Sequence, residues 1–368
     1  MTWFLNCDIF RAIFGLRKKF FLIREITTQT RETTAPIATD NERKIPLLKG
    51  ATDPFSYVAN ELRLVEETLV RAIHSREADL TDISGHLING GGKRVRPMVT
   101  LLAYSAFGGK RTTDIVDIAT AIELIHTATL LHDDILDAAE TRRGKESAFK
   151  KYGLKSTLVA GDFLFIKAFE FAGKFDETVV QWTADACTQL TEGEILQGHF
   201  NRNSAVTLTD YIEIVTRKTA SLFHTGTKVG AYLAGATPAL IEETERYGLN
   251  MGIAFQMVDD ILDVVAHPDL LGKPVGIDLR DGNPSLPIIL GLKNNDRAVC
   301  AAFECSNPSE VQIQRALASI KNGPAIGEAR SLAKRYAEEA LKSIKKLPPS
   351  LYRNGLKTLV QLIIDRDF

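Results

Sequence analysis

Residues 132–144, HDDILDAAETRRG, lie at the C-terminal end of a long apolar pattern with helical spacing. At 3.6 residues per turn, His126, Asp133 and Asp137 fall within about 20° of a common direction, so one helix face presents an imidazole and two carboxylates. Mg²⁺ commonly binds one or two carboxylates together with phosphate oxygens of a substrate. Taken alone, however, residues 133–137 are more often a solvated helix face.

The same pentapeptide, DDILD, recurs at residues 259–263 inside a second apolar helical pattern, residues 252–265. Unpaired carboxylates are costly to bury, so two copies on apolar helices require a partner. Helical bundles often build metal sites from side chains on facing helices. The repeat therefore predicts two carboxylate clusters that hold several Mg²⁺ ions and a diphosphate between them.

A basic, glycine-rich segment, GGGKRVRP, occupies residues 90–97. Its glycines allow close backbone approach, and Pro97 suits the first turn of a helix. Free N–H groups at a helix start add to the charge of Lys93, Arg94 and Arg96, which makes this segment a candidate anion site. A basic loop before a helix, without a ligand, is the alternative interpretation.

The 368 residues are 45% hydrophobic and 25% charged, with a formal net charge of −1. This composition is that of a globular protein, and it offers no basic field for a nucleic-acid partner. Cys7, Cys187, Cys300 and Cys305 form no metal-binding or disulfide pattern. Charges interrupt the most apolar stretch, so we do not expect the body of the protein to be integral to a membrane.

The fold class expected from periodicity is all-α, because apolar residues recur at three and four positions from about Thr52 onward. Residues 57–74 form one such stripe, and a helix is expected from an N-cap at Thr209. Loops are predicted at Pro284, at Pro287 and over residues 307–324. We therefore expect one large helical bundle over residues 51–368.

Residues 1–50 differ from the rest of the chain, with a basic, aromatic-rich start followed by a threonine-rich stretch. This pattern predicts a targeting or disordered segment. The basic bias favours a mitochondrial presequence, with a plastid or cytoplasmic location as alternatives.

Together these motifs, with GDFLF, KTASLF, FQMVDDILD and GKPVGIDLRDG, resemble the trans-polyprenyl diphosphate synthases. The resemblance runs from about Glu61 to the C-terminus. It implies the isoprenoid synthase fold, a single large helical bundle with a central cavity. It also implies a Mg²⁺-dependent prenyltransferase that condenses isopentenyl diphosphate with an allylic diphosphate by ionisation, condensation and elimination.

The resemblance also assigns residues. It implies two to three Mg²⁺ ions held by Asp133, Asp137 and Asp259, with Asp134, Asp260 and Asp263 completing the aspartate motifs. Contacts to the allylic diphosphate are expected from Arg142, Lys218 and Lys273, and contacts to isopentenyl diphosphate from Lys93, Arg96, His126 and Arg143. Thr219 and Gln256 are expected near the developing cation.

Positions just before the first aspartate cluster form the floor of the product pocket in this family, and here they are Ala128 and Thr129. Their small size predicts a long product, in the solanesyl to decaprenyl range, for a quinone side chain such as that of ubiquinone. A geranylgeranyl diphosphate synthase, or a subunit of a heteromeric synthase, stays open. Close helix packing is the structural alternative for these two small residues.

The partners implied are the two diphosphate substrates and a second copy of the chain in a homodimer, with a heteromer left open. Peripheral contact with a membrane for product release is also left open, and no nucleic acid is expected. A terpene cyclase of the same fold is disfavoured, because such enzymes lack the acceptor site represented by Lys93, Arg96 and His126.

Overall fold

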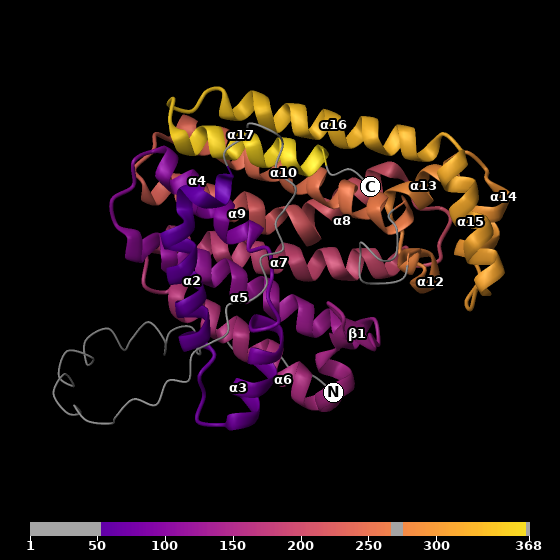
Figure 1. Ribbon diagram of the computed structural model, residues 1–368, viewed down its shortest axis with the longest axis horizontal. Helices are drawn as coiled ribbons and strands as arrows, with labels where there is room; N and C mark the ends of the chain where they lie inside the picture. Colours follow the sequence, from indigo (N-terminus) through magenta and orange to yellow (C-terminus); the bar gives the residue numbers. More distant parts are fainter. Residues whose placement is uncertain (1–52, 266–274, 366–368) are drawn as a thin grey trace. The chain divides into compact units, whose positions relative to one another are not determined.

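The computed structural model describes residues 53–265 and 275–365, all of which belong to one compact unit of the chain. The predicted targeting segment, residues 1–50, and the predicted ligand Lys273 lie outside these described residues. The described residues are almost entirely helical, which confirms the expected fold class (Figure 1).

The helices alternate with short connections, and within the described ranges the strands are confined to one hairpin. In chain order the elements are η2 Pro54–Val58, α2 Ala59–Ala72, α3 Ala78–Ile88, α4 Val95–Ala106, α5 Thr112–Leu136, β1 Thr141–Arg142, β2 Lys145–Glu146, α6 Ala148–Ala172, α7 Glu177–His199, α8 Leu208–Val215, η3 Thr216–Ala220, α9 Ser221–Leu233, α10 Pro238–Val265, α12 Ile277–Asp281, α13 Leu286–Lys293, α14 Arg297–Phe303, α15 Glu310–Asn322, α16 Ala325–Ile344 and α17 Leu351–Ile364.

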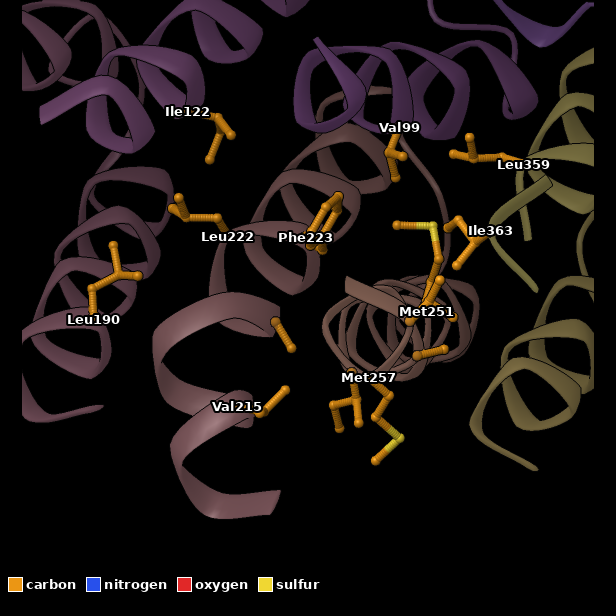
Figure 2. Close-up of a cluster of buried hydrophobic side chains, with 14 of the residues drawn as sticks. Val99, Ile122, Leu190, Val215, Leu222, Phe223, Met251, Met257, Leu359 and Ile363 are labelled. Atoms are coloured by element: carbon orange, nitrogen blue, oxygen red, sulfur yellow. The ribbon is translucent and has the colours of Figure 1, made fainter. Parts of the chain in front are cut away.

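The core forms where α9 packs between α4, α5, α7 and α10. Phe223 of α9 lies in the middle of this cluster, with Val99 of α4 and Met251 of α10 directed toward it (Figure 2). Leu222 points the other way, toward Leu190 of α7 and Ile122 of α5. These residues are buried, so their apolar surface supplies the hydrophobic free energy that holds the helices together.

Helix α5 is long and apolar enough to cross a membrane by length and composition, but 72% of its apolar window is buried within the protein. It packs along α6 and against α2, α4 and α9. A helix that is apolar on most sides is typical of the centre of a large bundle. Its surroundings thus identify α5 as a core helix, in line with the expectation from the interrupted apolar stretch.

Three local expectations were wrong. The N-cap of α8 is Thr207, which forms a capping box with Asp210, because Asp210 is three residues after Thr207 and only one after Thr209. Residues 307–324 contain helix α15, begun by a capping box between Ser309 and Gln312. Pro287 is the second residue of α13, where its missing N–H costs no hydrogen bond.

Residues 216–220 form a π-helical turn, η3, that joins α8 to α9. Such wide turns are rare, and they occur often at functional sites. Two close contacts hold this turn. A Cβ at Gly193 of α7 would lie 2.8 Å from the backbone nitrogen of Lys218, and a Cβ at Gly252 of α10 would lie 2.7 Å from the Cα of Ala220. Only glycine lets α7 and α10 approach the turn this closely.

Candidate functional site

The first aspartate cluster ends helix α5, with Asp137 as the C-cap residue. Asp133 is half-buried and Asp137 is exposed, so these two carboxylates lie on the accessible side of the helix end. Asp134 differs, because its side chain is fully buried. It pairs with Arg142 Nε at 2.5 Å and accepts a hydrogen bond from the backbone nitrogen of Ala148 at 3.1 Å. Asp134 thus fastens the start of α6 to the end of α5.

A third carboxylate and a lysine face Asp133 and Asp137. Lys218 of the π turn forms an ion pair with Glu194 of α7. The pKa of Asp133 is raised to about 6, because burial, Glu194 and Asp137 together raise it by more than Lys218 lowers it. Burial also lowers the pKa of Lys218, but Asp133, Glu194 and Asp137 outweigh burial and raise it overall. The pocket therefore gathers more negative charge than its lysine balances.

This donor set fits a divalent cation that is shared with a substrate. Among the described residues, no three imidazole, thiol or carboxylate groups come close enough to hold a metal ion without other ligands. Mg²⁺ usually keeps only one or two protein carboxylates and completes its shell with phosphate oxygens and water. Asp133 and Asp137 suit that role, because their repulsion and burial disfavour the ionised state until a cation arrives.

The second aspartate cluster lies within α10, two to six residues before the helix ends at Val265. Asp259 is half-buried, whereas Asp260 and Asp263 are each only 6% exposed. Asp263 accepts a hydrogen bond from the backbone nitrogen of Asp278 at 3.3 Å. The charge of Asp259 acts on Arg96 of α4, so this part of α10 faces the basic segment.

Asp281, the last residue of α12, lies close enough to both aspartate clusters to be affected by their charges. Burial raises the pKa of Asp281, and the charges of Asp137 and Asp263 raise it further. An effect from both carboxylates means that the ends of α5 and α10 lie near one another. The aspartates of the two DDILD copies therefore lie close enough for their charges to interact with the same group, as the repeat predicts.

Arg94 in the basic segment has a structural role. It adopts a left-handed backbone conformation, with φ of 44°, as the N-cap of α4. Its buried guanidinium contacts Glu123 at 2.8 Å, Glu66 at 2.5 Å and the carbonyl oxygen of Ile88 at 2.9 Å. Backbone strain of this kind persists only where side-chain contacts enforce it. Arg94 therefore fixes the course of the loop at Lys93 and the start of α4, which carries Arg96.

Arg96 and Arg143 place two positive charges close to His126. One Arg96 nitrogen lies 3.3 Å from His126 Nε2, and its guanidinium lies 4.8 Å from the centre of the Phe223 ring. The buried Nε of Arg96 has no hydrogen-bond partner among the residues that the structure describes. Burial lowers the pKa of His126 well below its usual value, and the neighbouring arginines lower it further. A half-buried guanidinium, a neutral imidazole and a second arginine form a site for an anion.

The RRG motif forms the turn of the β1–β2 hairpin. Arg143 and Gly144 are its two loop residues, with φ of 53° and 75°, as a two-residue hairpin turn requires. This geometry directs the two arginines to different places. Arg142 pairs with Asp134, whereas Arg143 donates a hydrogen bond to the carbonyl oxygen of Gly91 in the basic segment. The hairpin thus connects the first aspartate cluster to the anion site.

Thr219 and Gln256 are hydrogen-bonded to one another beside Lys218, with 2.9 Å between Thr219 Oγ1 and Gln256 Oε1. Of the residues proposed as a pocket floor, Thr129 keeps partial exposure while Ala128 is fully buried. The hydroxyl of Thr129 donates a hydrogen bond to the carbonyl oxygen of His126 at 2.8 Å.

Sequence reasoning named most of the groups that come together here, although their roles remain predictions. It missed Glu194, which lies on an otherwise ordinary helix, and Asp281, which follows the GKPVGIDLR segment. Glu194 has a detectable signal, since GEILQG places it between two glycines on a helix. The expected central cavity also stays a prediction. A surface cavity of about 540 Å³ lies at the far end of α5, beside Thr112, Val116 and Phe171.

The chain is similar to known proteins over most of its length. Residues 77–320 match the family model described as polyprenyl synthetase. The chain is 32% identical to octaprenyl diphosphate synthase of Haemophilus influenzae, over 84% of this chain and 94% of that protein. It is 33% identical to heptaprenyl diphosphate synthase component 2 of Geobacillus stearothermophilus, over 85% of this chain and 98% of that protein.

Solved structures show the same likeness. A polyprenyl synthase from Caulobacter crescentus, complexed with calcium and isoprenyl diphosphate, superposes with a TM-score of 0.82 at 32% identity, over 85% of this chain and 97% of that one. A geranylgeranyl pyrophosphate synthetase from Pyrococcus horikoshii superposes with a TM-score of 0.79 at 31% identity, over 85% and 98%.

Proposed function

Since the chain belongs to the polyprenyl synthetase family, we propose that it condenses isopentenyl diphosphate with an allylic diphosphate to build a long all-trans polyprenyl diphosphate. One observation carries this proposal. The site pairs a carboxylate-rich pocket at Asp133 and Asp137 with a separate guanidinium pocket at Arg96 and Arg143. Two pockets of opposite charge suit two diphosphates, one held through cations and one held directly.

Asp133, Asp137 and Asp259 would hold Mg²⁺, which when bound supplies positive charge to a leaving diphosphate. The presence of calcium and isoprenyl diphosphate in the Caulobacter protein supports a divalent cation in the same fold. Lys218 and Arg142 lie beside the carboxylates and would add fixed positive charge to the same diphosphate. Such preorganised charge costs no reorganisation when the bond breaks.

The remaining roles follow from the chemistry of the second substrate. Arg96, His126 and Arg143, with Lys93, would bind isopentenyl diphosphate and direct its double bond toward the allylic carbon. His126 stays neutral, so it would donate a hydrogen bond rather than a charge. Thr219 and Gln256 would line the space where the allylic cation develops. The proton lost in the last step would leave with the diphosphate, so no basic side chain is required.

Several wider aspects belong to this proposal. Long-chain product rests on the small, partly exposed Thr129 and on the octaprenyl synthase among the relatives, with a geranylgeranyl synthase as the alternative. Exposed apolar residues on α6, such as Leu154, Leu158 and Ile166, support a second copy as partner. A heteromer is the other option, since one relative is named a component. A mitochondrial address, supply of a quinone side chain and membrane contact at product release complete the proposal.

The test uses the purified full chain alone, with Mg²⁺, farnesyl diphosphate and labelled isopentenyl diphosphate, and separates the dephosphorylated products by length. We expect products in the solanesyl to decaprenyl range, lost on chelation and restored by Mg²⁺. Arrest at geranylgeranyl would establish the alternative product. Absence of any elongation would favour a subunit that needs a different partner.

A second arm of the same assay separates the two diphosphate pockets. Arg96→Ala should raise the KM for isopentenyl diphosphate about tenfold or more, with a smaller effect on the allylic substrate, because it removes a charged hydrogen-bond donor. Arg111→Ala is the control, since Arg111 is an exposed arginine at the opposite end of α5. Equal loss for both substrates would mean that the two pockets are wrongly assigned.

A further inference from the structure

Tyr211 is a buried residue outside the sequence motifs that nevertheless reaches the second aspartate cluster. It belongs to α8 and is only 2% exposed. Its hydroxyl donates a hydrogen bond to Asp260 Oδ2 at 2.8 Å. The backbone nitrogen of Leu286, the first residue of α13, donates to the same oxygen at 3.0 Å. Two donors from different helices therefore hold one oxygen of Asp260 in place.

The other oxygen of Asp260 faces Gln256, which lies one turn earlier on α10. Gln256 Nε2 donates to Asp260 Oδ1 at 2.8 Å. A carboxylate can only accept hydrogen bonds, so it fixes which end of the glutamine amide points toward it. The amide oxygen of Gln256 must then face the opposite way. There it accepts the hydrogen bond from Thr219 Oγ1 at 2.9 Å.

This sequence of donors and acceptors determines the polarity of Thr219. A threonine hydroxyl has one proton to donate, and Thr219 uses that proton on Gln256. The lone pairs of its oxygen can then only accept hydrogen bonds or face positive charge. Thr219 follows Lys218, whose ammonium group acts on Asp133. Thr219 is thus the immediate neighbour of a residue that acts on the first aspartate cluster.

We propose that Tyr211 is a positioning residue, which through Asp260 and Gln256 orients Thr219 so that its oxygen lone pairs stabilise the developing allylic cation. The proposal rests on the proposed function. It also assigns Asp260 to this hydrogen-bond network rather than to a metal ion, because both of its oxygens already have donors. Tyr211 remains a donor throughout the working pH range, since burial and Asp260 raise its pKa well above the usual value.

The structure offers a matched control in Tyr247. This tyrosine is also fully buried, and its hydroxyl donates to the carbonyl oxygen of Leu356 at 2.9 Å, between α10 and α17. Tyr247→Phe and Tyr211→Phe each remove one buried hydroxyl and one hydrogen bond to oxygen. A purely structural effect should therefore be similar in the two variants, whereas an effect on catalysis should appear only in Tyr211→Phe.

The experiment measures kcat, the KM for isopentenyl diphosphate, the Mg²⁺ concentration for half-activation and the unfolding midpoint of the full chain. Tyr211→Phe should lower kcat about 10- to 100-fold, as loss of a residue that orients a catalytic group commonly does. Its KM and Mg²⁺ requirement should stay within about twofold of the wild-type values. Tyr247→Phe should lose comparable stability and keep kcat within about twofold.

Asp260→Asn provides a second route to the same answer if Tyr211→Phe folds poorly. It should lower kcat without changing the Mg²⁺ requirement, whereas Asp259→Asn should raise that requirement. The double variant Tyr211→Phe with Asp260→Asn should be no slower than the slower single variant, because both act through one network.

Three results would overturn the proposal while leaving the proposed function intact. These are a wild-type kcat in Tyr211→Phe, an equal loss of kcat in Tyr247→Phe, or a raised Mg²⁺ requirement in Asp260→Asn. An inactive wild-type chain would instead count against the proposed function itself, so the two failures are distinguishable.

Discussion

The pentapeptide DDILD occurs twice in this chain, and its two copies lie in different settings. The first copy ends α5, so Asp137 becomes an exposed C-cap, whereas the second copy continues within α10 and buries Asp263. In both copies the middle aspartate is buried. Asp134 is held by a guanidinium and a backbone amide, while Asp260 is held by a tyrosine, a glutamine and a backbone amide.

The comparison teaches that identical sequence does not give equal roles to its members. The first aspartate of each copy stays partly accessible and is suited to a cation. The middle aspartate of each copy fastens helices together, by charge in one case and by neutral donors in the other. Position along the helix and the partners available from other elements decide the difference.

The largest expected effect tests whether the first aspartates are equivalent. Asp133→Ala and Asp259→Ala should each lower turnover by at least about a thousandfold, because positive charge held at the leaving group is the main source of rate enhancement. Turnover is measured at saturating substrate and Mg²⁺, with circular dichroism to confirm an intact fold. Wild-type turnover in either variant would show that Asp133 and Asp259 are not equivalent, and would contradict the assignment of the site.

The middle aspartates should differ in their contribution to stability. Asp134→Asn breaks a buried ion pair with Arg142 and should lower the free energy of unfolding by about 3 kcal/mol. Asp260→Asn loses only neutral donors and should cost about 1 to 2 kcal/mol. Denaturant unfolding without Mg²⁺ measures both, and Glu67→Gln, in an exposed pair, serves as the control. Equal costs would show that charge adds nothing to the first copy.

The copies also differ one turn upstream, where Thr129 precedes Asp133 and Phe255 precedes Asp259. Thr129→Phe would give both clusters a phenylalanine beneath them, and we expect the product to shorten to farnesyl or geranylgeranyl diphosphate. One helical turn rises about 5.4 Å, close to one extended isoprene unit.

Product analysis by chain length tests this expectation. Ala128→Phe is the comparison, since a phenylalanine at that fully buried position should destabilise the fold by overpacking instead of shortening the product. An unchanged long product from Thr129→Phe would place the pocket floor elsewhere.

The smallest expected effect concerns pH. Burial raises the pKa of both Asp133 and Asp260 to about 6, above the value expected in the unfolded chain. Each carboxyl group therefore adds to the free energy of unfolding while it is protonated. This contribution is lost as pH rises from about 4 to about 6. From pH 4 to pH 6, Asp133→Asn and Asp260→Asn should each lose less stability than the wild type does, whatever difference in stability the substitution causes at pH 4.

Mg²⁺ should separate the two copies in this measurement. Added Mg²⁺ should restore the stability that the wild type loses when Asp133 ionises above pH 6. The difference in stability between the wild type and Asp260→Asn should not change with Mg²⁺, because only Asp133 is expected to bind a cation. Thermal unfolding at pH 4 to 7, with and without Mg²⁺, provides the check. An identical response to Mg²⁺ in both variants would argue against different roles.

Much of the fold and the motif residues could be predicted from the sequence because helical periodicity and DDILD are local patterns. The capping boxes at Thr207 and Ser309 were also present in the sequence, as a threonine or serine with a polar residue three positions later. Asn-Pro and Gly-Pro at the ends of residues 307–324 favoured a loop.

Other features had no local signal. Tyr211 is 49 residues from Asp260, and nothing near it in sequence indicates that contact. The π turn likewise cannot be predicted from the sequence, because RKTAS would fit a regular α-helix equally well. Contacts of this kind depend on how α8, α10 and α13 pack, which the periodicity of each helix does not specify.

The π turn at residues 216–220 makes this protein sensitive to insertions and deletions in a way that substitutions do not reveal. Removing one residue there would let α8 and α9 fuse into a continuous α-helix, which the local sequence tolerates. Every side chain before the deletion would then turn by about 100° relative to α9. Tyr211 would leave Asp260, and the face that carries Lys218 would change. In an alignment of relatives, a one-residue gap at this turn would therefore mark a lost or altered activity, even where every motif letter is retained.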